Sequence, residues 1–213
     1  MLDRLSFKGY IIVSCGTLRG ELNFLNKNDF LNADKILYTA PGLHESPREL
    51  EKQLKEQLTK AKKYSQKIIV VYGDKCYIDI ENPSRDINTL IQELDNHITR
   101  IKAKNCIDML TGINEREKIA KSQKIYWLSP GWMEYWKVIF KNWDKGKANE
   151  TFPQHDKAIV LDALDMFRKY STNSPEKILE FADWMGLGIE PYIISLDRLR
   201  NLLKDQILIK KED

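Results

Sequence analysis

Short runs of β-branched and other apolar residues recur along this sequence, and segments with helical periodicity separate them. The strand-like runs cover residues 10–13, 35–39, 67–72, 98–103, 124–128 and 157–161, with a further candidate at 192–194. Several are apolar at nearly every position, which is typical of strands covered on both faces. Alternation of such strands with helices predicts a parallel sheet with right-handed crossover connections.

Residues typical of helix N-termini mark the start of predicted helices, whereas the long polar segment 141–156 has no such signal. Ser46 followed by Pro47 is typical of a helix N-terminus, and the apolar positions that follow repeat with a period near 3.6. The polar segment 141–156 is expected to be a loop excursion. With 213 residues, we predict a single α/β domain over 1–213, with a mostly parallel, Rossmann-like sheet of about six strands and helices on both faces.

Composition limits what the protein binds and where it acts. Charged residues make up 31% and the net charge is +3, with acidic and basic side chains interleaved, so no nucleic-acid partner is indicated. No apolar run approaches the roughly 20 residues of a membrane span, and the run at 10–13 is too short for a signal peptide. Three cysteines, an odd number, argue against a secreted disulfide framework. We expect a cytoplasmic protein without a membrane partner, and no pattern indicates its oligomeric state.

All three cysteines follow predicted strands. Cys15 follows the first strand, Cys76 the third and Cys106 the fourth, while His44 follows the second. Ligands of open parallel sheets bind outside the carboxyl ends of the strands, so we expect these side chains to meet there. Three thiols and an imidazole suit a tetrahedral zinc or an iron centre. The sequence therefore predicts a metal site made of Cys15, His44, Cys76 and Cys106.

The same cysteines are also compatible with two metal-free interpretations. The sequence has no Cys-x-x-Cys pair, so no local metal-binding knuckle supports the site. A free cysteine is often a small core residue, which makes three unrelated structural thiols one alternative. A thiol nucleophile or a redox pair without a metal is another. His97 and His155 lie outside the strand-end pattern and are not assigned.

Residues near the same strand ends indicate a cofactor surface. Gly16 follows Cys15 where a turn would expose backbone N–H groups at a helix start. No Gly-x-Gly-x-x-Gly or Walker pattern follows it, so a nucleotide is not predicted. The other cofactor candidates are Arg19, Gly131 and Trp132. Trp132 belongs to a tryptophan-rich segment whose helical spacing favours core packing and leaves a ligand wall as the alternative. In that alternative the protein is a non-catalytic cofactor-binding or accessory protein.

Five segments resemble, in order, the motifs of the domain-of-unknown-function family 1638. They are Cys15-Gly16-Thr17-Leu18 with Glu21-Leu22, Gly42-Leu43-His44-Glu45-Ser46-Pro47, Tyr72-Gly73 with Cys76, Cys106-Ile107-Asp108-Met109-Leu110-Thr111-Gly112, and Tyr126-Trp127-Leu128-Ser129-Pro130-Gly131-Trp132. The resemblance spans residues 10 to about 203. It implies an α/β fold with a cysteine- and histidine-bearing site.

Three positions depart from the family's pattern. Tyr77 follows Cys76 where the family has a glycine-rich segment, Asn105 stands where it has Asp, and Asp162 lacks the Thr-Gly that follows it there. The chain is therefore identified as a divergent member. The resemblance implies a link to methyl-transfer or corrinoid metabolism, with a corrinoid as an alternative cofactor and a small molecule or a corrinoid protein as the partner. It implies no particular reaction or substrate.

Overall fold

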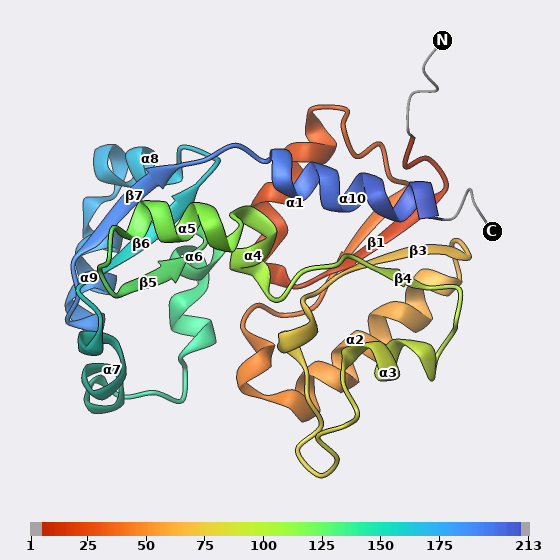
Figure 1. The fold of residues 1–213 in the computed structure, drawn as a ribbon, viewed down its shortest axis with the longest axis horizontal. Coiled ribbons are helices and arrows are strands. Elements are labelled where there is room, and N and C mark those ends of the chain that lie inside the picture. The colour runs from red at the N-terminus through yellow and green to blue at the C-terminus, as the bar shows by residue number, and fades with distance from the viewer. Residues whose placement is uncertain (1–5, 210–213) are drawn as a thin grey trace.

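The strands form two separate parallel sheets. The computed structural model describes residues 6–209, with Ile209 described by its backbone alone. The first sheet, in the order β2-β1-β3-β4, consists of β1 (Tyr10–Ser14), β2 (Lys35–Tyr38), β3 (Lys67–Val71) and β4 (Thr99–Arg100). The second, in the order β5-β6-β7, consists of β5 (Ile125–Leu128), β6 (Lys157–Asp162) and β7 (Ile189–Ile193) (Figure 1). The predicted α/β class is confirmed, and the strands divide between two sheets where one was expected.

Helices and 3₁₀ turns connect the strands. The helices are α1 (Arg19–Lys27), α2 (Pro47–Lys62), α3 (Ile87–Gln92), α4 (Cys106–Leu110), α5 (Ile113–Ala120), α6 (Pro130–Ile139), α7 (Lys145–Thr151), α8 (Met166–Asn173), α9 (Pro175–Met185) and α10 (Asp197–Ile209). The 3₁₀ turns are η1 (Gly16–Leu18), η2 (Leu43–Glu45), η3 (Asp74–Cys76) and η4 (Phe152–Gln154). Between residues 6 and 209, no helix has the length and apolar character that crossing a membrane requires.

The break between the sheets falls after β4. This strand is two residues long and pairs with β3 only through Thr99 and Arg100. It therefore ends the first sheet at a short edge that offers little backbone for another strand. The chain then forms α4 and α5 before β5 begins the second sheet. Periodicity in a sequence identifies a strand but not its neighbours, which is why the division was not predicted.

Both faces of the first sheet are covered, as expected. Alternate side chains of a strand point to opposite faces. Ile11 and Val13 of β1 pack on the side of α2 and α3. Ile12 of the same strand packs on the opposite side, in a cluster with residues of α1 and α10. The apolar runs in the sequence therefore reflect a sheet buried between two layers of helices.

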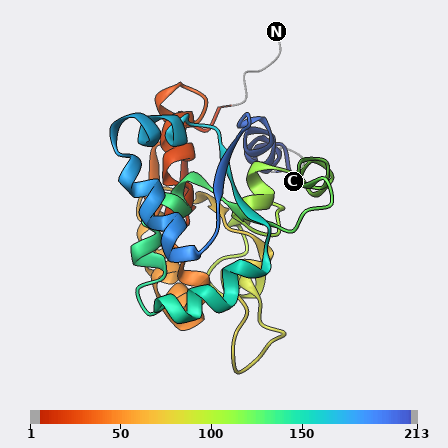
Figure 2. The ribbon, with the colours of Figure 1, turned by 90° about the vertical axis from the view of Figure 1, so that its left-hand side faces the viewer.

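The segment 141–156, expected to be a loop, contains α7 and η4 instead. The Asp144 carboxylate caps α7 by accepting a hydrogen bond from the Lys147 backbone N–H at 2.8 Å. Ala148 and Phe152 are fully buried in a cluster with residues of α6 and α9. In Figure 2 α7, α8 and α9 lie at the end of the molecule that faces the viewer. Tertiary burial decides the structure of this segment because its polar sequence carries little helix signal of its own.

The two sheets meet through backbone contacts at a glycine. Gly131, in the first turn of α6, lies so close to η1 that an added Cβ would stand 1.9 Å from the Thr17 carbonyl oxygen. Gly73, after β3, is packed in the same way, because its Cβ would stand 2.3 Å from the Lys104 carbonyl oxygen. Both distances lie well below the 3.0 Å that real Cβ atoms respect. Only glycine fits these positions without moving the backbone.

The substitution Gly131→Ala is expected to destabilise the fold strongly, because the added methyl group overlaps the Thr17 carbonyl. Urea denaturation should show a loss of about 3 kcal/mol in the free energy of unfolding. Gly188→Ala is the matched control, since nothing lies within 4 Å of its added Cβ, and its effect should stay within about 1 kcal/mol. Equal losses in the two variants would contradict this account of the contact.

Candidate functional site

The carboxyl ends of the first-sheet strands bring the predicted metal ligands to one small cavity. Cys15 follows β1, His44 lies in η2 after β2, Cys76 ends η3 after β3, and Cys106 opens α4 after β4. All four border a cavity of about 20 Å³, and Trp132 of α6 borders it from the second sheet's side. Residues far apart in the sequence therefore share one enclosed space.

The volume of this cavity corresponds to a single small occupant. A water molecule needs roughly 10–15 Å³ measured in this way, so about 20 Å³ accommodates one water or one ion. Over residues 6–209, no three His, Cys, Asp or Glu side chains are grouped as a cluster that would hold a metal ion. The four side chains border the cavity without forming a preassembled coordination sphere.

Two hydroxyl-bearing side chains lie on the Cys15 side of the cavity. The Thr17 hydroxyl donates a hydrogen bond to Cys15 Sγ at 3.2 Å, and Tyr72 lines the cavity together with Cys15. Tyr72 is buried, and its hydroxyl pairs with that of Thr39. Burial raises the pKa of Tyr72 well above its ordinary value, and the neighbouring Cys15 adds to this effect. Tyr72 is therefore a neutral phenol that can donate a proton to a hydrogen bond at this sulfur.

The other two thiols are protonated at neutral pH. Burial raises the pKa of Cys76 to about 12, opposed by a backbone hydrogen bond at Gly73. Burial also raises the pKa of Cys106 well above its ordinary value, and a charge on Cys76 or Cys15 would raise it further. A hydrogen bond with the Trp132 side chain opposes that rise. All three cysteines border the same cavity, so a charge on one thiol disfavours a charge on the others.

His44 is more exposed than the three cysteines, which are only partly buried. Its side chain is 36% exposed, and its Nε2 atom lies 3.6 Å from the Glu45 carboxylate. Its ring centroid is 5.3 Å from that of Trp132. Burial against this wall lowers the pKa of His44, an effect that Glu45 partly offsets. The imidazole is therefore neutral at pH 7, the form in which histidine binds metals.

The four cofactor candidates have different surroundings. Trp132 borders the cavity. Gly16 and Gly131 are buried against backbone atoms, with an added Cβ of Gly16 standing 2.8 Å from the Thr39 carbonyl oxygen. Arg19 is exposed, and its guanidinium lies 4.5 Å above the centre of the Tyr38 ring. Only Trp132 of the four lines the cavity that the cysteines share.

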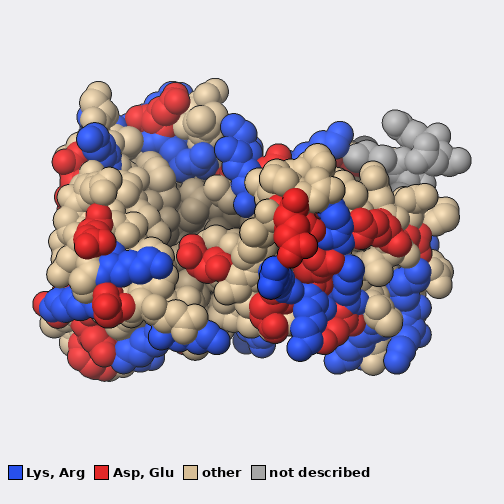
Figure 3. Space-filling view, turned by 90° about the horizontal axis from the view of Figure 1, so that it is seen from below, with Lys and Arg blue, Asp and Glu red and all other residues tan. Residues whose placement is uncertain are grey.

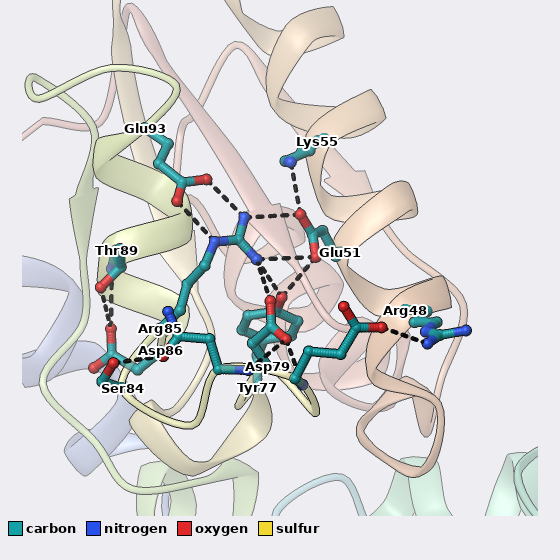
Figure 4. Close-up of polar contacts among 12 residues, drawn as sticks. Arg48, Glu51, Lys55, Tyr77, Asp79, Ser84, Arg85, Asp86, Thr89 and Glu93 are labelled. Carbon is teal, nitrogen blue, oxygen red and sulfur yellow. Dashed lines mark hydrogen bonds and ion pairs between the residues drawn. The ribbon is translucent and has the colours of Figure 1, made fainter.

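An arginine-centred network anchors the chain after Cys76 (Figure 4). The side chain of Arg85 forms ion pairs with three carboxylates, those of Glu51, Asp79 and Glu93. Tyr77, the residue after Cys76, donates its hydroxyl to Glu51 Oε2 at 2.6 Å. Hydrogen bonds from Arg85 hold the pKa of Glu51 well below its usual range. Because Glu51 belongs to α2, the network holds the Cys76 segment against that helix.

Comparison with known protein families identifies one that matches this chain. The sequence profile described as "Protein of unknown function (DUF1638)" matches residues 38–203, which is more than half of the chain. The chain belongs to this family. The resemblance inferred from the motifs is thereby confirmed. The DUF1638 match includes His44, Cys76, Cys106 and Trp132 and begins after Cys15. No curated protein and no solved structure matches the chain.

Glu21 of α1 is a buried carboxyl group close to this DUF1638 site. Within the described residues, neither of its carboxylate oxygens has a hydrogen-bond partner on another residue. Burial raises the pKa of Glu21 to about 7, and the nearby Asp162 at the end of β6 adds to the rise. Glu21 in turn contributes to the raised pKa of Cys106.

The raised pKa of Glu21 makes stability depend on pH. Ionisation begins near pH 4.5 in the unfolded chain but only near pH 7 in the folded one, so the unfolded state binds fewer protons in this window and stability falls as pH rises through it. Glu21→Gln is expected to remove this slope and to be more stable than the wild type at about pH 8 by on the order of 3 kcal/mol. Urea denaturation at about pH 5 and about pH 8 measures both effects.

Glu56→Gln is the control for this experiment. Glu56 lies on the exposed side of α2, so its replacement should leave the pH slope unchanged. If Glu21→Gln and the wild type show the same slope, Glu21 does not carry a raised pKa in the folded state.

Proposed function

We propose that the cavity binds one zinc or iron ion through Cys15, His44, Cys76 and Cys106. The observation that supports this is the convergence of these side chains, from four separate strand ends, on one ion-sized cavity. Thiolates and imidazoles are the donors that zinc and iron accept most readily in proteins. No other group of residues in the described part of the chain offers three sulfurs from cysteine, because Cys15, Cys76 and Cys106 are all the cysteines of the sequence.

The cavity fits an ion better than it fits a large cofactor. Pockets for small organic molecules and cofactors measure roughly 300–1,000 Å³, whereas this cavity measures about 20 Å³. A corrinoid would have to lie outside it. Because the described side chains are not grouped as a preformed cluster, we expect the thiols to close on the ion as it binds.

The surrounding residues would support such a centre. The Thr17 hydroxyl donates a hydrogen bond to Cys15 Sγ, and a hydrogen bond of this kind orients a thiolate ligand and reduces its charge. The buried Trp132 covers the cavity beside Cys106, which excludes water from that side. When bound, the ion would supply Lewis acidity. The partly exposed His44 is the position at which a small molecule would approach.

This arrangement favours an enzyme or a methyl-transfer accessory protein over a purely structural site. A structural centre is normally closed on all sides, whereas the His44 side is open to solvent. If no metal binds, the cavity is a pocket of neutral thiols and the protein is a non-catalytic accessory or cofactor-binding protein. Metal content separates these two outcomes.

Protein purified without oxygen is expected to contain about one zinc or iron ion per chain by elemental analysis. An absorption band above about 350 nm would favour an iron centre or a bound corrinoid over zinc, and elemental analysis for iron and cobalt separates the two. Cys106→Ser should lower both the metal content and the melting temperature, because metal binding of this kind is coupled to folding.

His97→Gln is the control, because His97 is 88% exposed and pairs with Asp95, outside the cavity. The metal content of this variant should equal that of the wild type. A loss of metal in this variant would show that His97, and not His44, is the imidazole ligand. Less than about a tenth of an ion per wild-type chain after incubation with zinc would contradict the proposal.

A further inference from the structure

A groove much larger than the metal cavity lies beside it, between the two halves of the molecule. One wall follows β2 and includes Glu45 of η2 and Glu49 of α2, and the other includes Ile139 of α6 and Trp143 before α7. Its volume is about 570 Å³, within the range of pockets that bind small molecules. Figure 3 shows the surface hollowed where the two halves meet.

The groove and the metal cavity are separated by one turn of chain. Leu43 and Glu45 of η2 line the groove, whereas His44 between them lines the cavity. None of the three cysteines borders the groove. A molecule in the groove would therefore lie next to His44 without touching a sulfur atom.

The wall after β2 is acidic. Glu49 accepts a hydrogen bond from the Gln53 side chain at 2.8 Å, and the same Gln53 side chain accepts one from the Ala40 backbone N–H at 2.9 Å. These contacts hold the Glu49 carboxylate in place along the groove. Glu45 contributes a second carboxylate, which lies 3.6 Å from Nε2 of the neutral His44 imidazole. Each carboxylate keeps acceptor capacity for a further donor.

The opposite wall is basic and partly aromatic. Lys141 and Lys147 line it, and the Lys147 ammonium group lies 4.3 Å above the centre of the Trp143 ring. Over residues 6–209, neither lysine forms a salt bridge, so the charges of the two walls do not pair with each other across the groove. The exposed side chain of Val138 adds apolar surface to the same wall.

We propose that this groove binds a small zwitterionic molecule, with its amine at Glu45 and Glu49 and its carboxylate or phosphate at Lys141 and Lys147. Opposite charges on facing walls fix the direction of such a ligand, because the reversed orientation places like charges together. The groove exceeds a single amino acid in size, so a ligand of dipeptide size or larger fits it. This inference does not depend on the metal proposal, since no cysteine lines the groove.

Alanyl-alanine is a suitable probe, followed by the amide and indole signals of Gly42, Lys141 and Trp143 in ¹⁵N-labelled protein. Saturable shifts are expected with a dissociation constant on the order of 1 mM. The N-acetylated dipeptide lacks the amine and the dipeptide amide lacks the carboxylate. Each should bind about two- to fivefold more weakly, because each loses one exposed charged contact.

Variants that remove one charge from a wall test which wall contacts the amine of the ligand and which contacts its carboxylate. Lys141→Gln should reduce the difference in affinity between the dipeptide and its amide, because Lys147 alone remains at the carboxylate, and should leave the effect of acetylation unchanged. Glu45→Gln should reduce the effect of acetylation, because Glu49 alone remains at the amine, and should leave the effect of amidation unchanged. Glu56→Gln, on the exposed side of α2, is the control and should keep both differences.

The absence of shifts up to about 20 mM dipeptide would overturn the inference. Equal binding of all three compounds, or variants that weaken all three alike, would also overturn it. The titration is repeated with and without added zinc, and the dipeptide is expected to bind in both cases. A failure of metal binding would therefore leave the result for the groove unchanged.

Discussion

The contact between Gly131 and the Thr17 carbonyl is the constraint on which the candidate site depends. It holds the first turn of α6, and with it the second sheet, against the carboxyl end of the first sheet. The next residue, Trp132, is thereby placed over the cavity that the three cysteines border. Without this contact, the first sheet would present its thiols in an open crevice. The cavity is thus made by both sheets, with the proposed ligands from the first and the cover from the second.

Strand positions could be predicted from local sequence, whereas pairing and several helices could not. Each apolar run contains or overlaps an observed strand, including 192–194, which overlaps β7. The first sheet ends at β4 because of tertiary packing, and the hydrophobic periodicity of the sequence does not show where a sheet ends. The sequence indicated only a helix start at Gly16 and no extent for α1, because Gly20 and two asparagines weaken its helix propensity. Its formation depends on burial of Leu22 and Leu25 against the first sheet.

The convergence of the site residues could be predicted because it follows from a general rule about parallel strands. Other parts of the site carry no such local signal. Arg85 and Glu51 are separated by 34 residues, and no pattern pairs them before the fold is known. Arg19 follows the Cys15 motif closely, yet its side chain lies over Tyr38 and not in the cavity. The groove between Glu45 and Lys141 exists only because the two sheets meet.

The central claim is that Cys15, Cys76, Cys106 and His44 share one ion. X-ray absorption at the metal edge of the zinc-loaded protein tests this claim most directly, because it reports which atoms surround the ion. We expect about three sulfur neighbours at roughly 2.3 Å and one nitrogen at roughly 2.0–2.1 Å. A first shell that contains only oxygen and nitrogen would contradict it.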